Sequence, residues 1–373
     1  MINSSPGTAY NPEAVQSALR IAIEQFQQQT LALSSSSTSA IASDPTSPTG
    51  IPTGPGYYRH SRHSSLAVPQ STRRRKVIAF DLYGTLLSTD SIAHELAKHY
   101  GEEAAPGIAT LWRRFQLEYT WRITSMGEFK NFQEITRSAL GHALMEHSGI
   151  KLTAKAASEL MRAYDSLHVY PDVEAGLKLL KDAKEGKTLE EVTEEGEGEG
   201  EYTTRKEVPS PQSLDVRDST GRSSSRSSAS SSSSSSLPEM DAYIFTNGTP
   251  EMAMRSMVTS PELSHHTKAS ERGLFSDPGS IVSADSVQCY KPDPRVYQHL
   301  LDVAGVRTEQ DKRNVWVISA NPFDVVGAKA AGLRAAWIDR AGKGWVDRLD
   351  EMRVPSVTAT GVDEAIKAIL SWN

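Results

Sequence analysis

The sequence predicts an α/β protein with a doubly wound, Rossmann-like parallel sheet as its core and an inserted helical cap. Two observations carry this prediction. Short apolar runs, typical of strands buried on both faces of a parallel sheet, alternate with longer segments in which apolar residues recur at helical spacing. Polar residues gather directly after several of these runs, where ligands bind in sheets of this class.

The elements follow one another in a strand–helix alternation. The predicted strands are VIAFDL (77–82), AYIFT (242–246), SIVSA (280–284), VWVIS (315–319) and RAAWID (334–339). The predicted helices are 92–100, 107–123, 127–147, 153–167, 173–184, 250–257, 294–304 and 323–331. Residues 91–168 contain helical patterns but no strand, so we expect a helical cap inserted after the first strand. The core is then expected to consist of 76–90 and 169–373.

Two stretches of the 373-residue chain are too poor in apolar residues to form a core. Residues 1–75 are expected to be a mostly disordered N-terminal tail with a short amphipathic helix at 12–33. Residues 186–238 combine a glutamate-rich run with a serine tract, and we expect a disordered, low-complexity insertion within the core. A long surface loop adds little closure entropy, so the core can accommodate it.

Composition excludes several classes of protein. The chain has 40 Lys and Arg against 46 Asp and Glu, a net charge of −6, and lacks the basic footprint of a general nucleic-acid binder. No apolar run approaches the ~18 residues of a membrane-spanning helix, so neither nucleic acid nor membrane is an expected partner. The single cysteine, Cys289, excludes an intramolecular disulfide.

The N-terminal residues and one basic cluster predict the cellular location of the protein. The first residues, MINSSPGTAYNPEA, lack the basic and apolar regions of a secretory signal. We therefore expect a cytoplasmic protein. The basic cluster Arg73–Lys76 is typical of a solvated boundary ahead of a strand, but as an import signal it leaves a nuclear pool open.

Polar residues next to the predicted strand ends form a single set. It comprises Asp81, Tyr83 and Thr85 after the first strand, Thr246 and Asn247 after the second, Lys291 before the helix at 294–304, and Ser319, Asn321 and Asp324 after the fourth strand. Taken singly, each group is also typical of a turn or a helix cap. Together, and in this order, they favour one site at the carboxyl edge of the sheet.

The order D-x-x-G-T, T-N, K-P and S-x-N-x-x-D resembles the haloacid dehalogenase superfamily, and in particular its L-2-haloacid dehalogenase (type II) branch. The segments that carry this resemblance are FDLYGTLL (80–87), LWRRFQLEYTWR (111–122), MGEFKNF (126–132), VQCYKPDPRVY (287–297) and SANPFDVVGAKAAGL (319–333). They span most of the expected ordered chain and neither low-complexity region.

The resemblance implies hydrolytic dehalogenation of short-chain (S)-2-haloalkanoic acids to (R)-2-hydroxy acids and halide. Asp81 would attack the halogen-bearing C2 of the 2-haloacid from the back and form an ester, so the configuration inverts. Water would then hydrolyse the ester. No cofactor and no metal ion is implied, and a homodimer through the cap helices would follow by analogy alone.

Polar roles carry over from the family one residue at a time. Arg113, on a cap helix, would hold the departing halide. Thr246 and Asn247 would grip the substrate carboxylate. Lys291 would pair with the nucleophile and with Asp324 and keep both carboxylates ionised, and Asp324 would orient or activate the hydrolytic water.

Supporting roles complete the implied site. Thr85, Ser319 and Asn321 would hold the nucleophile and the hydrolytic water, and Tyr297 would hydrogen-bond from behind them. Four side chains would form apolar walls, or else pack in an ordinary core: Tyr83, Leu117, Phe132 and Phe323.

At four positions the sequence differs from the motifs of the superfamily's phosphatases or of its dehalogenases. Tyr83 stands where phosphatases of the superfamily have a second aspartate, and Asp324 is a single acid where metal-binding members usually have two, which makes a poor cage for Mg²⁺. Thr246 and Phe323 replace the serine and tryptophan usual in the dehalogenases. Two alternatives stay open: a Mg²⁺-dependent small-molecule phosphatase, and a catalytically idle core that serves as an interaction module.

Overall fold

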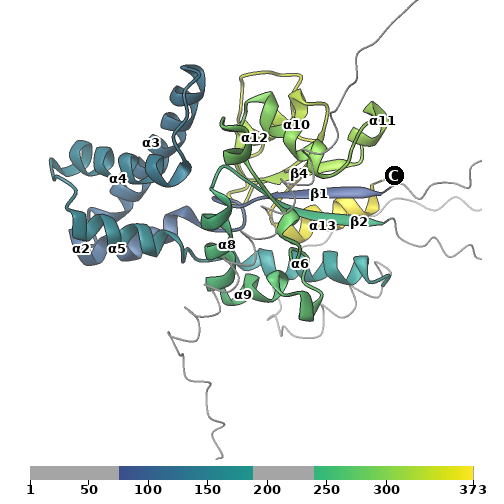
Figure 1. Ribbon diagram of the computed structural model, residues 1–373, viewed down its shortest axis with the longest axis horizontal. Helices are drawn as coiled ribbons and strands as arrows, with labels where there is room; N and C mark the ends of the chain where they lie inside the picture. Colours follow the sequence, from purple (N-terminus) through teal and green to yellow (C-terminus); the bar gives the residue numbers. More distant parts are fainter. Residues whose placement is uncertain (1–74, 188–238, 373) are drawn as a thin grey trace, which may run out of the picture.

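A computed structural model describes residues 75–187 and 239–372 (Figure 1). The predicted N-terminal tail with its helix at 12–33, and the predicted insertion at 186–238, lie almost wholly outside the described residues. Within the described ranges, no helix has the length and the apolar character needed to cross a bilayer.

The core is a six-stranded parallel sheet in the order β3-β2-β1-β4-β5-β6. Its strands are β1 (Lys76–Asp81), β2 (Met240–Thr246), β3 (Ile281–Ser283), β4 (Val315–Ser319), β5 (Arg334–Ile338) and β6 (Val357–Ala359). Every residue of β1 and β4 is buried, as expected of central strands covered on both faces. The predicted doubly wound α/β sheet is confirmed, with β6 as a strand that the sequence did not reveal.

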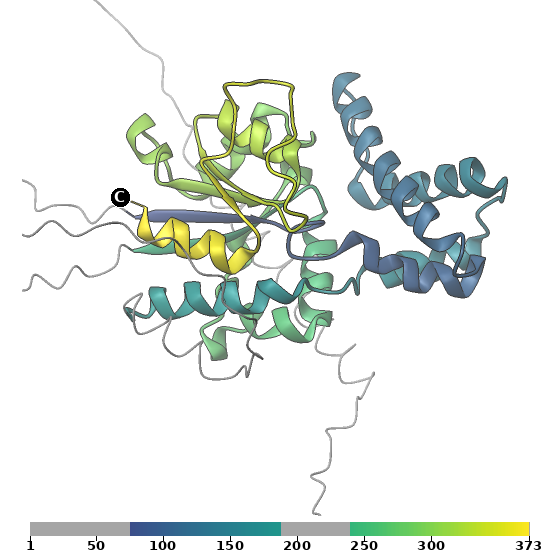
Figure 2. The same cartoon turned by 180° about the vertical axis from the view of Figure 1, so that it is seen from behind.

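Helices cover both faces of this sheet (Figures 1 and 2). The core helices are α6 (Pro171–Lys184), α8 (Pro250–Thr259), α9 (Pro261–Ser264), α10 (Pro294–Val303), α11 (Glu309–Lys312), α12 (Pro322–Ala330) and α13 (Val362–Ser371). Helices α6 and α13 pack against each other on one face, and α10 and α12 lie on the other. Short 3-10 turns are found at Thr89–Ile92, His265–Thr267, Ala269–Glu271, Pro278–Ser280 and Ala284–Val287.

Four further helices form a unit of their own beyond the carboxyl end of β1, on the left of Figure 1. This helical unit comprises α2 (Ala93–Tyr100), α3 (Ala105–Ser125), α4 (Phe132–Ser148) and α5 (Ala154–Tyr164). Helix α4 begins later than predicted because Asn131 caps it, accepting a hydrogen bond from the backbone N–H of Glu134 at 2.9 Å. The indole N–H of Trp112 donates to the carbonyl of Thr136 at 2.7 Å and joins α3 to α4.

Two chain segments connect the helical unit to the core, and they are hydrogen-bonded to each other. The N–H of Ser88 donates to the carbonyl of His168 at 2.8 Å, and the N–H of Tyr170 donates to the carbonyl of Leu86 at 3.1 Å. The outgoing and the returning chain are thus held side by side. This pairing fixes the unit next to the strand end that carries Asp81.

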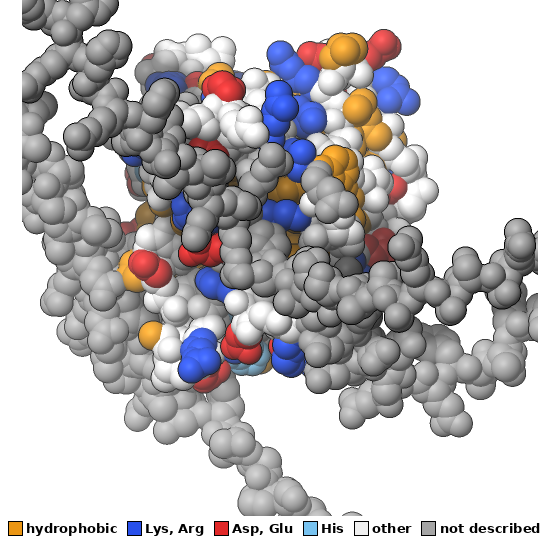
Figure 3. All heavy atoms as spheres, turned by 90° about the vertical axis from the view of Figure 1, so that its right-hand side faces the viewer, with side chains coloured by type: hydrophobic (Ala, Val, Ile, Leu, Met, Phe, Trp, Pro, Cys, Tyr) orange, Lys and Arg blue, Asp and Glu red, His pale blue; other side chains and the backbone are white. Residues whose placement is uncertain are grey.

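The opposite end of the sheet is anchored by a buried lysine. Lys76, the first residue of β1, donates from Nζ to the carbonyls of Ile369 at 2.7 Å and Trp372 at 2.8 Å. These carbonyls lie at and just after the carboxyl end of α13, where the helix dipole favours a cation. Figure 3 shows this end of the molecule, with Lys and Arg side chains beside hydrophobic ones.

Candidate active site

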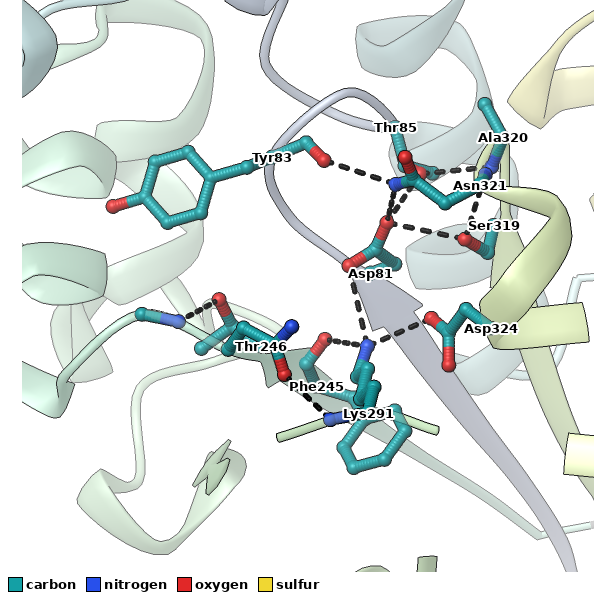
Figure 4. Close-up of polar contacts among 12 residues, drawn as sticks. Asp81, Tyr83, Thr85, Phe245, Thr246, Lys291, Ser319, Ala320, Asn321 and Asp324 are labelled. Atoms are coloured by element: carbon teal, nitrogen blue, oxygen red, sulfur yellow. Dashed lines mark hydrogen bonds and ion pairs between the residues drawn. The ribbon is translucent and has the colours of Figure 1, made fainter. Parts of the chain in front are cut away.

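The predicted polar residues meet at the carboxyl ends of the three central strands (Figure 4). Asp81 is the last residue of β1, Thr246 the last of β2 and Ser319 the last of β4. Because β1 lies between β2 and β4, the loops that follow these strands surround the carboxylate of Asp81.

The carboxylate of Asp81 is held asymmetrically. Its Oδ2 accepts hydrogen bonds from Oγ1 of Thr85 at 2.7 Å, Oγ of Ser319 at 3.1 Å and Nδ2 of Asn321 at 2.6 Å. Its Oδ1 accepts only from Nζ of Lys291, at 3.2 Å, among the interactions of the described residues. Three neutral donors therefore orient the group through Oδ2, while Oδ1 contacts only the ammonium of Lys291 among the described groups and keeps a lone pair for reaction.

A tight turn follows Asp81 and depends on Gly84. This residue has φ of +88°, a conformation that disfavours side chains, and its N–H donates to the carbonyl of Leu87 at 2.7 Å. A Cβ atom here would also lie 3.4 Å from the side chain of Asn321. The turn directs the carbonyl of Tyr83 toward Asn321, whose Nδ2 donates to it at 3.1 Å.

Lys291 connects the two acids of the site. Its ammonium group donates to Oδ1 of Asp81 at 3.2 Å, to Oδ2 of Asp324 at 2.7 Å and to the carbonyl of Phe245 at 2.8 Å. The side chain is 1% exposed, so all three protons of the buried cation have acceptors and its charge is balanced by two carboxylates. The expected pairing with both acids is present.

Asp324 is fully buried in the first turn of α12. Its Oδ1 accepts from the hydroxyl of Tyr297 at 2.8 Å, so Tyr297 does hydrogen-bond from behind the site. Burial raises the pKa of the Asp324 carboxyl above its usual range, although the neighbouring ammonium group and the tyrosine hydroxyl lower it. We expected pairing with Lys291 to keep Asp324 ionised, and burial opposes that ionised form. A raised pKa is typical of a carboxyl that accepts protons in catalysis.

Arg113 reaches the site from α3 of the helical unit. Its Nη2 donates to the carbonyl of Tyr83 at 3.0 Å and to Oδ1 of Asn321 at 3.2 Å. Its Nη1 donates to Oε1 of Gln116 at 2.7 Å. Gln116, which we did not predict, is fully buried and is held in turn by the hydroxyl of Tyr164, which donates to the same Oε1 at 3.1 Å.

Thr246 and Asn247 lie on the β2 side of the site. The hydroxyl of Thr246 accepts from the N–H of Gly248 at 2.9 Å and keeps its own proton to donate. Oδ1 of Asn247 accepts from the backbone N–H of Lys291 at 3.0 Å, which fixes the orientation of the amide. Its Nδ2 forms no hydrogen bond with another described residue, so this donor is available to a ligand.

The four predicted wall residues do not all meet. The rings of Tyr83 and Phe132 stack with their centroids 5.8 Å apart. Leu117 lies one turn after Arg113 on α3 and is half-buried. The ring of Phe323 packs edge-on against Trp121 instead, with a centroid distance of 5.5 Å, and both line a separate cavity of about 530 Å³.

The position of Lys291 argues against the alternative of a Mg²⁺-dependent phosphatase. The ammonium of Lys291 lies between the carboxylates of Asp81 and Asp324, where a cation bridging these acids would bind. Among the described residues, no three His, Cys, Asp or Glu side chains come close enough together to hold a metal ion. These donors do not fit a hard cation that requires several oxygen ligands.

The chain was compared with known proteins. No protein-family model matches it. It is 29% identical over 271 residues to the (S)-2-haloacid dehalogenase of Pseudomonas sp. (strain YL), which covers 72% of this chain and 84% of that protein. It is 28% identical over 272 residues to (S)-2-haloacid dehalogenase 4A of Burkholderia cepacia, again covering 72% and 84%. A crystal structure of a dehalogenase aligns with a TM-score of 0.55 and 25% identity over 80% of this chain and 98% of that one. The resemblance predicted from the motifs is confirmed.

Proposed function

Since the chain matches the L-2-haloacid dehalogenases in sequence and in fold, we propose that it hydrolyses short-chain (S)-2-haloalkanoic acids to (R)-2-hydroxy acids. The observation that carries this proposal is the carboxylate of Asp81. Three neutral donors hold its Oδ2, while Oδ1 contacts only the ammonium of Lys291 among the described groups. This arrangement suits a carboxylate nucleophile.

In the first step, Oδ1 of Asp81 attacks C2 of the substrate from the side opposite the halogen. A bond forms between Oδ1 and C2, and the electron pair of the carbon–halogen bond leaves with the halide. The guanidinium of Arg113 stabilises the departing anion without transferring a proton. The free Nδ2 of Asn247 and the hydroxyl of Thr246 bind the substrate carboxylate.

In the second step, water attacks the carboxyl carbon of the ester. Negative charge develops on Oδ2, and the donors on Thr85, Ser319 and Asn321 already point at that atom, so they act as an oxyanion hole. Asp324 takes one proton from the water, the bond between the carboxyl carbon and Oδ1 breaks, and the alkoxide that leaves with Oδ1 takes up that proton; the second proton of the water is released as Asp81 ionises. The 2-hydroxy acid leaves, Asp81 is regenerated, and each turnover releases one halide and one proton.

We further propose that the helical unit acts as a cap. It carries Arg113 to the site, and the contacts of this side chain with Tyr83 and Asn321 tie the unit to the core. The proposed mechanism requires no metal ion, because Lys291 supplies the positive charge between the two acids. Homodimerisation and a cytoplasmic location stay predictions; light scattering after size exclusion would test the dimer.

The test is halide release from L- and D-2-chloropropionate in the presence of EDTA. We expect release from the L-isomer alone and a loss of about 10³-fold or more in kcat for Asp81→Asn and Lys291→Met. Asp302→Asn, an exposed aspartate at the far end of α10, is the matched control and should retain full activity.

Three other results would contradict the proposed function or favour one of the two alternatives. No halide from either isomer would contradict the proposed function. Phosphate release from phosphomonoesters that requires added Mg²⁺ would indicate the phosphatase alternative. An Asp81→Asn protein that matches wild type in every activity would indicate the idle core.

A further inference from the structure

A cavity with a largely polar lining, distinct from the one beside Phe323, lies where the helical unit meets the core. It measures about 500 Å³ and is lined by residues of α4, α5 and α8, together with Asp165, which directly follows α5. Arg137 of α4, Arg162 of α5 and Arg255 of α8 all contribute to its walls. The end of α5 approaches α8 in Figure 1, and the hydroxyl of Thr259 donates to the carbonyl of Asp165 at 2.7 Å.

The positive charges of this cavity are incompletely neutralised. The side chains of Arg137 and Arg162 have no hydrogen-bond or ion-pair partner among the described residues. Nε of Arg255 is buried and lies 3.0 Å from Oδ2 of Asp165, but the two are not aligned as a hydrogen bond. Exposed arginines elsewhere on the unit differ: Arg114 pairs with Glu146 at 2.8 Å.

We propose that this cavity is a binding site for a phosphate group, free or carried on a small molecule. Planar guanidinium groups pair with phosphate oxygens through two parallel hydrogen bonds, and three of them line one cavity. The side chains of Gln133 and Ser158 add neutral donors. The volume exceeds what a single phosphate fills, so there is room for a carrier.

Three further features favour an anion here. The first turn of α4, a helix of 17 residues, contributes lining residues, and the N-terminal end of a helix attracts negative charge. The two acids in the lining, Glu134 and Asp165, are fewer than the three arginines. Burial also raises the pKa of Asp165 to about 6, although Arg255 lowers it, so the negative charge of this carboxyl is lost as the pH falls below 6.

The cavity is separate from the candidate active site but adjacent to it. Its lining includes none of the acids or the lysine of that site. Ser256, the neighbour of Arg255, lies with its hydroxyl 3.4 Å from that of Tyr83. A phosphate held by all three arginines would connect the helical unit, through Arg137 and Arg162, with the core, through Arg255.

The test is isothermal titration of the full chain with inorganic phosphate and with phenyl phosphate at constant ionic strength. We expect saturable binding of at least one probe, weakened 10-fold or more in the double variant Arg137→Gln/Arg162→Gln. The control is Arg114→Gln/Arg122→Gln, which removes the same charge from paired arginines on α3 and should bind as wild type does. Tighter binding of phenyl phosphate would identify a carried phosphate, and tighter binding of inorganic phosphate a free one.

Two results would overturn the proposal. One is the absence of saturable binding of either probe to the wild type. The other is binding that survives in Arg137→Gln/Arg162→Gln but disappears in Arg113→Gln, which would place the anion in the active site. Thermal unfolding of each variant checks that it is folded. Because the readout is binding, the outcome does not depend on dehalogenase activity.

Discussion

At the scale of single residues, Gln116 decides how Arg113 is held. Its Oε1 accepts from Arg113 at 2.7 Å, and its Nε2 donates to Oγ1 of Thr136 at 2.7 Å. Each end of the amide therefore has a fixed partner, and the acceptor end faces the guanidinium. This orientation preorganises the group proposed to receive the halide.

Replacing Gln116 by Leu should release Arg113 from that position. We expect kcat/KM for halide release to fall about 10- to 100-fold, because a charged donor loses its acceptor, and unfolding to become easier by ~1–3 kcal/mol. The inhibition constant of added bromide measures the halide site directly and should rise in parallel. Gln298→Leu, on the exposed side of α10, is the control; equal bromide inhibition in wild type and Gln116→Leu would contradict the argument.

The sequence predicted which polar residues come together at the site, but it did not predict the partner of each side chain. Strand ends and motif order brought Asp81, Lys291 and Asp324 to one edge, because parallel strands share that edge. Gln116 was missed since a polar residue on a predicted helix normally faces solvent, although it lies three positions after Arg113, on the same helix face. The ring of Phe323 packs edge-on against Trp121, a contact that no local pattern encodes, and its expected role as a wall of the site stays a prediction.

At the scale of elements, the site depends on how closely α12 packs against α10. Gly327 of α12 has no side chain, and a Cβ atom there would overlap the hydroxyl group of Tyr297 on α10. That hydroxyl donates to Asp324. The close approach of the two helices therefore sets the environment of the proposed general base.

Gly327→Ala should push Tyr297 away from Asp324. We expect unfolding to become easier by ~1–3 kcal/mol through overpacking, and the second chemical step to slow more than the first. Rapid-quench measurements should then show a burst of halide before a slower steady state. Gly141→Ala in α4 is the matched control, because its Cβ would meet only Leu152 at 3.9 Å or more; a similar loss in both variants would count against this role for Tyr297.

Most elements with strong local patterns were predicted, with α13 as an exception, and short elements with weak patterns were not. The predicted strands at 77–82 and 315–319 correspond to β1 and β4, whose residues are all apolar or buried. Strand β6 has three residues, only one of them buried, so its pattern is too short to detect. Helix α13 was overlooked although Val362, Ala365, Ile366 and Ile369 follow helical spacing, so this signal was present.

At the scale of the whole molecule, an ion pair between the end of the helical unit and the core, Asp165 with Arg255, links the stability of the fold to pH. Asp165 follows α5, and burial raises the pKa of its carboxyl to about 6 from the ordinary 3.8, although Arg255 of α8 lowers it. The folded protein therefore holds a proton on this group at a pH at which the unfolded chain has lost it. Folding stability from this group is present below pH ~4 and is lost as the pH rises through 6.

Asp165→Asn removes this titration, and its effect should depend on pH. We expect the free energy of unfolding of the wild type, relative to the variant, to fall by roughly 2–3 kcal/mol between pH 4 and pH 7. Urea unfolding at several pH values measures this difference. A difference that stays constant across the range would show that Asp165 does not titrate as described.

The division of the chain into a core and a cap stays a prediction.

The central position of β1 has a consequence for the synthesis of the protein. Two of the side chains that hold Asp81, Ser319 and Asn321, lie 238 and 240 positions after it in the chain. At ~5–20 residues per second, a ribosome needs roughly 10–50 s to make that stretch. For this time β1 lacks its neighbour β4 and two of the donors that hold Asp81. A chain that stops before Ser319 has its nucleophile but lacks two of the three neutral donors that hold it.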